Sequence, residues 1–208
     1  MKILKAMAVV FFIAALATAF GTPVKADAHD KLTIFRFSQP VELPGVALPA
    51  GTYVFKLADT SGDRNIVQVF DKDQTHVLAT FVGIPDYRPQ PSDKSLIRFS
   101  ETTAGGPPAI KEWFYPGDAY GVEFAYPKSR AAELAKASNQ AVPSMPSNLA
   151  SDIKSSKTST DSSAMAMKGA PIKAEQPNGD EVEVDEVFII HVPASPMAGN
   201  TVHNVNSD

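Results

Sequence analysis

Hydrophobic and polar residues alternate along several short stretches in the first two-thirds of the chain. An alternation with a period of two places successive side chains on opposite faces of a β-strand. Glycine, proline and aspartate residues separate these stretches, as they do where turns connect strands. Closely spaced strands of this kind predict a mainly β fold, a small antiparallel β-sandwich or barrel. The predicted strands cover residues 32–37, 53–57, 66–70, 76–84, 96–99 and 120–126.

Two segments carry a helical pattern instead. The segment PKSRAAELAKAS, residues 127–138, begins with a proline that suits a first helical turn and continues with good helix formers. Its apolar residues Ala131, Leu134 and Ala135 share one face, which we expect to pack on the sheet as a capping helix. The segment PPAIKEWFY, residues 107–115, is expected to form one or two helical turns after its prolines.

Aromatic residues mark the part of the chain that can form a core. Of the eighteen, fourteen lie from Phe35 to Tyr126, and none lies from Pro127 to Val187. A segment without large apolar side chains does not bury enough surface to offset the entropy of its chain. We therefore expect a folded β-domain at residues 29–138, followed by a flexible Ser/Thr/Lys/Ala-rich linker at residues 139–181.

The strand pattern returns at residues 182–193. Val182 and Val184 alternate with acidic residues, and a compact apolar run follows. That run would favour aggregation if it were exposed, so we expect it to add to the edge of a sheet, in the same chain or in another molecule. Residues 194–208 are polar and are expected to be disordered. The apolar run begins with Val187, Phe188, Ile189 and Ile190.

The N-terminus has the three-part layout of a secretory signal peptide. The basic head MKILK precedes the uncharged apolar run at residues 6–20, and GTPVKADA follows with small residues suited to cleavage. The run is shorter than the roughly 20 residues that a membrane-spanning helix needs. We expect cleavage after Ala28, which would remove a signal peptide of residues 1–28 and leave no stable membrane span. Cleavage after Ala26 and an uncleaved membrane anchor are the alternatives. The expected location is the periplasm, the cell surface or the medium.

Charge and cysteine content exclude several classes of function. The chain has a formal net charge of −4, and loss of residues 1–28 removes three lysines and one aspartate, which leaves −6. An acidic chain with no basic run is a poor nucleic-acid binder, because phosphate contacts need clustered Lys and Arg. The absence of cysteine excludes disulfides, thiol catalysis, thiolate metal sites and a lipid-modified cysteine.

Motifs for catalysis are missing as well. There is no G-x-S-x-G and no H-E-x-x-H, and no two histidines have metal-ligand spacing, so we expect no cofactor and a non-enzymatic protein. Glu112 with Glu123, or Asp118 with Glu123, is a possible carboxylate pair for glycoside chemistry. Charged residues at the ends of strands are more commonly solvated.

One segment has a weak resemblance to a calcium loop. The sequence DTSGDRN spaces oxygen-bearing side chains at alternate positions around a glycine, although the order differs from that of an EF-hand. The same residue types are ordinary turn formers, so a β-turn is the simpler interpretation. The weak calcium candidates are Asp59, Ser61, Asp63 and Asn65.

The aromatic stretch WFYPGDAYGVEFAYP, residues 113–127, is the strongest candidate for a binding surface. Alternate residues from Tyr120 form an apolar face that we expect to be core. Trp113, Phe114 and Tyr115 are consecutive, so at least one of them is expected near the surface, where it can stack on a sugar ring or a proline. The candidate ligand-binding residues are Trp113, Tyr115, Asp118 and Tyr120.

The segments FSQPVELPGVALPAGTYVFKLAD, RNIVQVFDKD, LATFVGIPDYR and WFYPGDAYGVEFAYPKSRAAELAKA occur in this order. Together they resemble a family of uncharacterised exported bacterial β-domain proteins that share a signal peptide, a PAGTY strand, a WFYPG segment and a YPK sequence leading into a helix. The resemblance covers residues 33–143 and implies export and a β-domain, but no activity. LPAGTYVFKL is also similar to strands of carboxypeptidase-regulatory-like and other Ig-like modules.

Three functions are compatible with these observations. The first is an exported non-enzymatic binding or structural module with an extracytoplasmic ligand or protein partner. The second is an enzyme that acts on cell-envelope glycans through Glu and Asp carboxylates. The third is an assembly protein whose C-terminal strand adds to a neighbouring molecule. A deep polar cavity with two facing carboxylates would favour the enzyme, and a filled interior would favour the binding module.

Overall fold

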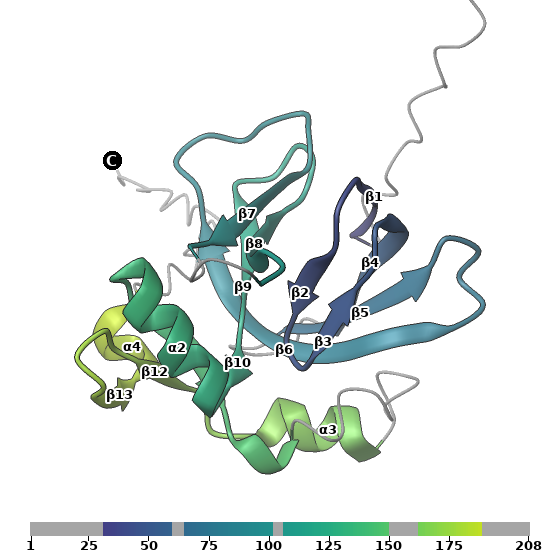
Figure 1. Cartoon of the computed structure of the whole chain (residues 1–208). Helices are drawn as coiled ribbons and strands as arrows, with labels where there is room; N and C mark the ends of the chain where they lie inside the picture. Colours follow the sequence, from purple (N-terminus) through teal and green to yellow (C-terminus); the bar gives the residue numbers. More distant parts are fainter. Residues whose placement is uncertain (1–30, 60–64, 102–105, 150–161, 189–208) are drawn as a thin grey trace, which may run out of the picture.

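The computed structural model describes residues 31–59, 65–101, 106–149 and 162–188 (Figure 1). Within these ranges, the first sheet has nine strands and the second has four. The strands of the first sheet are β1 Leu32–Phe37, β2 Val41–Leu43, β3 Val46–Leu48, β4 Gly51–Asp59, β5 Asn65–Asp71, β6 Val77–Tyr87, β7 Leu96–Ser100, β8 Ala109–Phe114 and β9 Tyr120–Phe124. Those of the second are β10 Tyr126–Pro127, β11 Val142–Met145, β12 Lys173–Glu175 and β13 Glu181–Glu183. The helices are α2 Lys128–Ser138, the 3-10 turn η2 Ser147–Leu149, α3 Ser162–Gly169 and α4 Val184–Val187.

The long strand β6 joins the two halves of the first sheet. The strand order is β1-β4-β5-β6-β9-β8-β2-β3, with β7 also paired to β8. The first part of β6 pairs with β5 and its second part with β9, and both pairings include Gly83. In Figure 1 the strand curves beneath both halves, so that they face each other. This arrangement confirms the predicted mainly β, sandwich-like fold.

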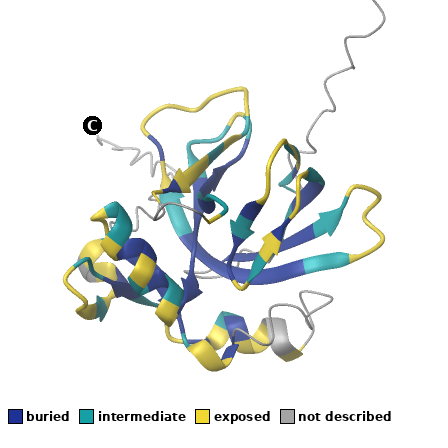
Figure 2. Ribbon diagram, in the orientation of Figure 1, coloured by how far each residue is buried: buried dark blue, intermediate teal, exposed yellow. Residues whose placement is uncertain are grey.

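The core fills the space between the two halves. Phe55 on β4 meets Trp113 on β8 edge to face, with ring centroids 5.8 Å apart. Phe81 on β6 meets Phe124 on β9 in the same way at 4.6 Å. All four side chains are buried, and Figure 2 shows that burial runs through the middle of the strands. Edge-to-face pairs of this kind add to the hydrophobic stabilisation of a core.

Tyr126 connects the first sheet to the second. Its ring is buried, and its hydroxyl lies 2.8 Å from the carbonyl oxygen of Ile110 and 3.1 Å from that of Glu42. These two carbonyls belong to β8 and β2, so one side chain holds the hairpin β2–β3 against the sheet. We expect Tyr126→Phe to reduce the free energy of unfolding by about 1.5 kcal/mol, because buried carbonyls lose their donor.

Urea denaturation of the Tyr126→Phe variant checks this expectation. Tyr120→Phe is the matched control, since the structure shows no hydrogen bond from the Tyr120 hydroxyl among the described residues. Equal midpoints for the two variants would mean that the Tyr126 hydroxyl contributes nothing to stability.

Two of the sequence predictions about helices have different outcomes. The helix predicted at residues 127–138 is confirmed as α2, with Ala131, Leu134 and Ala135 buried. It packs mainly on β10, β11 and β12 of the second sheet, and its Arg130 also forms an ion pair with Glu42 on β2 of the first sheet. The helical turns predicted at residues 107–115 are wrong, because this segment forms β8, which pairs with β7 on one side and β9 on the other. Pairing on both edges outweighs the local preference.

The linker predicted at residues 139–181 is also wrong where the structure describes it. β11, η2, α3 and β12 lie in this segment, and residues 150–161 lie outside the described ranges. Apolar side chains such as Met145, Met167 and Ala174 are buried here. They do not form a core of their own but fill gaps beside α2, β5 and β6. The composition of residues 139–181 does not show that other parts of the fold offer a surface on which these side chains are buried.

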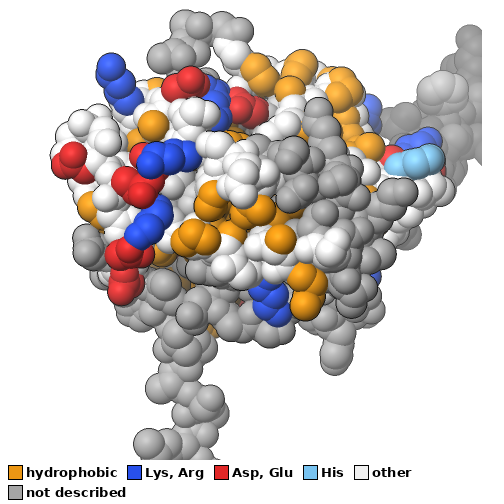
Figure 3. All heavy atoms as spheres, turned by 90° about the horizontal axis from the view of Figure 1, so that it is seen from below, with side chains coloured by type: hydrophobic (Ala, Val, Ile, Leu, Met, Phe, Trp, Pro, Cys, Tyr) orange, Lys and Arg blue, Asp and Glu red, His pale blue; other side chains and the backbone are white. Residues whose placement is uncertain are grey.

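Of the tail predicted as a strand at residues 182–193, the structure describes residues 182–188, and within them only the first two belong to a strand. β13 pairs with β12 of the same chain, and the helix α4 follows. Val187 ends α4, and Phe188 packs against the core, while Ile189, Ile190 and the rest of the tail lie outside the described residues. Figure 3 shows charges of both signs interspersed on the side of the second sheet. Charged side chains on an outer strand disfavour pairing with other molecules.

The signal peptide predicted at residues 1–28 and the polar C-terminus at residues 194–208 lie outside the described residues. Within the described ranges, every helix is too short or too polar to cross a membrane.

Candidate functional site

Three carboxylates meet on the outer face of the first sheet, away from the aromatic core. Asp86 is on β6, Glu112 on β8 and Glu123 on β9. Glu112 lies directly opposite Glu123 in the register, and Asp86 lies two residues along β6 from Ile84, the other neighbour of Glu123. One oxygen from each carboxylate lies within 4.8 Å of the other two. We call these three residues the carboxylate cluster.

A β-bulge brings a cation to the same face. The pairing of β7 with β8 skips Lys111, because Arg98 is opposite Glu112 and Phe99 is opposite Ile110. An extra residue of this kind redirects a side chain that would otherwise point to the opposite face. The Nζ of Lys111 lies 3.2 Å from Oε1 of Glu112 and 3.9 Å from Oε1 of Glu123.

Burial controls the protonation of the cluster. Glu112 and Glu123 are each only 4% exposed. Burial, together with the negative charges of Asp86 and Glu112, raises the pKa of Glu123 to about 8, although Lys111 acts in the opposite direction. Burial and the nearby Glu112 also raise the pKa of Asp86. Near neutral pH, Glu123 is therefore mostly protonated.

The hydrogen bonds of the cluster are unevenly distributed. Arg98 donates from Nη1 to Oε2 of Glu112 at 2.9 Å, and Lys111 donates to Oε1 of Gln140 at 3.1 Å. Oε1 of Glu123 is buried and has no hydrogen-bond partner among the described residues. Buried oxygens nearly always have such a partner, so this atom marks a position where a group outside the chain can bind.

A positively charged groove adjoins the cluster on the other side of Arg98. The loop at residues 88–95 and strand β7 line a hollow of about 580 Å³, which we call the arginine groove. Its charged lining residues are Arg88, Lys94 and Arg98, and no carboxylate lines it among the described residues. Arg98 thus touches both features, through its ion pair with Glu112 and through the groove wall.

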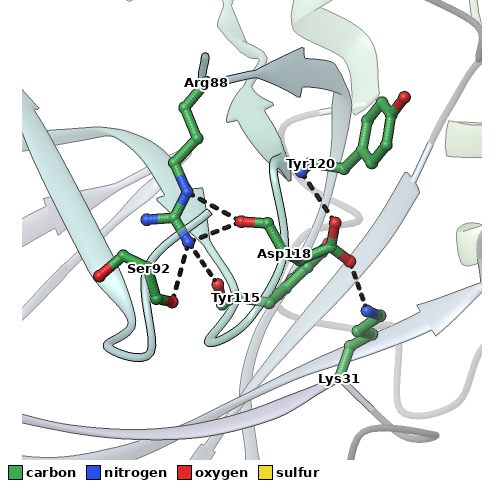
Figure 4. A network of polar contacts seen from close by, with 6 residues as sticks. All are labelled: Lys31, Arg88, Ser92, Tyr115, Asp118 and Tyr120. Carbon is green, nitrogen blue, oxygen red and sulfur yellow. Dashed lines mark hydrogen bonds and ion pairs between the residues drawn. The ribbon is translucent and has the colours of Figure 1, made fainter. Parts of the chain in front are cut away.

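Backbone carbonyls hold Arg88 in place (Figure 4). Its Nε and Nη2 donate to the carbonyl oxygen of Asp118 at 2.8 and 2.6 Å, and Nη2 lies 2.8 Å from that of Tyr115 and 3.3 Å from that of Ser92. The residue is 6% exposed. Its remaining nitrogen, Nη1, makes no hydrogen bond with the described residues, and in Figure 4 it points away from Asp118.

The aromatic residues predicted to bind a ligand lie mainly in the core. Trp113 and Phe114 are 0% exposed and Tyr115 is 5% exposed, so the expectation that one of them lies near the surface is wrong. Both faces of β8 are covered, because Trp113 meets Phe55 and Tyr115 while the guanidinium groups of Arg88 and Arg98 contact the ring of Phe114.

The other two candidates occupy the rim of the fold. Asp118 accepts hydrogen bonds from Lys31 at 2.6 Å and from the Tyr120 backbone at 3.0 Å. Burial opposes ionisation of Asp118, but these hydrogen bonds outweigh it and lower its pKa. Tyr120 is half-buried and lies 5.5 Å from the exposed ring of Tyr87. The structure therefore gives Asp118 a turn-stabilising position and joins Glu123 to Glu112 rather than to Asp118.

The weak calcium candidates fall at a gap in the described residues. Asp59 ends β4 and the buried Asn65 begins β5, but Ser61 and Asp63 lie outside the described residues. Sequence reasoning missed Asp86, which ends a strand and carries no motif. The alternation of β9 places Glu123 opposite the core face, and only the pairing with β6 reveals Asp86 as its neighbour.

Comparisons with family models, with curated proteins and with solved structures find no match to this chain. The resemblance to exported bacterial β-domain proteins therefore stays a prediction.

Proposed function

We propose that this protein is an exported, non-enzymatic module that binds an oxyanion-bearing polymer, carboxylated or phosphorylated, in the arginine groove. The observation that carries this proposal is the buried guanidinium of Arg88, which is held by carbonyls and has one nitrogen left for a ligand. A buried cation without a carboxylate partner is costly, and a bound oxyanion would offset that cost.

Preorganisation supports this function. The bonds from Arg88 to the carbonyls of Asp118 and Tyr115 fix the plane of the guanidinium before any ligand arrives. A fixed guanidinium loses little conformational freedom on binding, and its geometry matches carboxylate and phosphate oxygens. Lys94 and Arg98 add positive charge on the same wall. The chain as a whole carries a net negative charge, whereas the charged residues that line this groove are positive.

The shape of the groove suits an extended ligand. It is open to solvent, and Leu96, which is 36% exposed, contributes an apolar surface next to the cations. An apolar contact beside charged groups fits a sugar ring or a polymer backbone that carries anionic substituents. The interior between the two halves of the sheet is filled by aromatic side chains, which favours binding at the surface.

Isothermal titration of the chain from residue 29 tests this function. The probes are polygalacturonate and inorganic polyphosphate as oxyanion polymers, with dextran as the neutral control. We expect both anionic polymers to bind and dextran to give no signal. The affinity for the anionic polymers should fall as salt is raised from 20 to 200 mM, because salt screens the attraction between charges. The two anionic probes distinguish carboxylate from phosphate recognition.

A pair of matched variants locates the site. Lys94→Gln removes a charge from the groove, and Lys72→Gln removes the same charge from an exposed position on the β5–β6 hairpin. We expect Lys94→Gln to weaken binding about fivefold, in line with one partly exposed charge contact, and Lys72→Gln to leave it unchanged. Equal effects of the two variants would show that binding depends on net charge alone and would refute the site.

One observation favours a second function, an enzyme acting on cell-envelope glycans. Glu112 and Glu123 face each other, and the raised pKa of Glu123 makes it a proton donor near neutral pH. Their low exposure speaks against it, since a glycosidic bond would have to reach both carboxylates. Release of reducing ends from envelope glycans by the native chain, abolished in Glu112→Gln, would establish this function in place of the first.

A further inference from the structure

We propose that the carboxylate cluster is a binding site for a hard divalent cation, Ca²⁺ foremost, with Asp86, Glu112 and Glu123 as its protein ligands. This site goes beyond the binding of a polymer in the arginine groove. It also differs from the calcium loop that the sequence indicated at residues 59–65.

The geometry fits a cation without movement of the strands. One oxygen from each of the three residues lies within 4.8 Å of the others. Ca²⁺ binds oxygen at 2.3–2.6 Å, so two of its ligands lie at most about 5.2 Å apart. The ligands project from β6, β8 and β9, which are hydrogen-bonded neighbours, so the sheet holds them at fixed spacing.

The unpartnered oxygen of Glu123 is the second, independent indication. Oε1 of Glu123 is buried and accepts no hydrogen bond from the part of the chain that the structure describes, and Nζ of Lys111 is 3.9 Å away from it. That distance is too long for a hydrogen bond. The side chain is 5% exposed, so bulk water reaches this oxygen poorly. A cation between the three carboxylates would give this oxygen the partner that the described residues do not provide, and it would displace the proton that Glu123 holds near neutral pH.

The other charged groups around the cluster leave room for a cation. Arg98 binds Oε2 of Glu112, which leaves Oε1 for the ion. Lys111 lies 3.2 Å from that Oε1 and is the competitor for the position. The Lys111 side chain is 24% exposed and already donates to Gln140, so it can withdraw to that partner when the ion binds.

Terbium luminescence gives a direct readout of the site. Tb³⁺ occupies calcium sites and emits when a nearby tryptophan transfers its excitation, and Trp113, the only tryptophan of the chain, follows Glu112 on β8. We expect the chelator-treated chain from residue 29 to sensitise Tb³⁺ emission with one ion per chain. Ca²⁺ should displace the emission, and Mg²⁺ should do so less effectively, because it requires shorter ligand distances.

Variants with opposite expected effects make the proposal specific. Asp86→Asn should weaken Ca²⁺ binding at least about tenfold, because it removes a charged ligand. Lys111→Gln should strengthen it by about tenfold, because it removes the competing positive charge. Asp73→Asn, an exposed aspartate on the β5–β6 hairpin, is the matched control and should leave the affinity unchanged.

Circular dichroism of each variant establishes that it is folded before titration. Saturable binding with these three responses supports the site. The proposal is overturned by a lack of saturable Ca²⁺ binding at millimolar concentration, by equal effects of Asp86→Asn and Asp73→Asn, or by a weaker affinity in Lys111→Gln. None of these variants touches Arg88 or Lys94, so the result is independent of polymer binding in the arginine groove.

Discussion

Glu123→Gln is expected to make the protein about 4 kcal/mol more stable than the native chain at pH 8, and equally stable near pH 4.5. The native Glu123 has its pKa raised from the ordinary 4.5 to about 8. Between these values the folded state keeps a proton that the unfolded state has lost, so the free energy of unfolding falls as pH rises, by up to about 1.4 kcal/mol per pH unit. Glutamine is neutral throughout and has no such loss.

Urea denaturation from pH 4.5 to 9, in the presence of EDTA to remove cations, measures this difference. Glu101→Gln is the control, since Glu101 is exposed and the structure shows no ion pair for it among the described residues. If the difference in the free energy of unfolding between Glu123→Gln and the native chain stays constant across this pH range, the buried carboxylate of Glu123 is not the group that titrates.

Gly83→Ala is expected to destabilise the fold by about 3 kcal/mol, the upper part of the range for overpacked positions. A Cβ at this position would lie 2.3 Å from Cγ1 of Val122 and 2.6 Å from the carbonyl oxygen of Glu123. The second contact is with backbone, which does not move aside as a side chain does. Because β6 passes here from one half of the sheet to the other, relief of the clash would separate β6 from β9.

Gly106→Ala is the matched control for this substitution, because no described residue lies within 4 Å of the position of its Cβ. We expect its unfolding midpoint to stay within about 0.5 kcal/mol of the native value, as is usual at open surface positions. A loss in Gly83→Ala no larger than that in Gly106→Ala would mean that β6 and β9 are not packed as closely as described.

Alternation and β-rich composition located several strands correctly. The runs predicted at residues 32–37, 66–70 and 76–84 form β1, β5 and β6 close to the expected bounds, because alternation in the first run and β-rich composition in the other two both favour strands. The helix after Pro127 was equally clear from its composition. Errors occurred where a neighbour decides the outcome: β8 is a strand because β7 and β9 flank it, and β11 and β12 are ordered because α2 covers them.

The sequence predicted only part of the candidate site. Glu112 and Glu123 were recognised as a possible pair, but their burial and their contact with Asp86 were not. A charge at the end of a strand is usually solvated, and the sequence does not say what covers it. The aromatic stretch attracted attention by its composition, yet Trp113 and Tyr115 serve the core.

What the chain by itself determined is local: the period of each strand, the start of the helix after Pro127, and the lack of cysteine chemistry. The order of the strands in the sheet, and the burial of each side chain by neighbouring elements, were decided by the tertiary structure alone. Asp86, Glu112 and Glu123 become one cluster only because β9 lies between β6 and β8. Such neighbours depend on the packing free energy of the whole sheet, which no single segment of sequence contains.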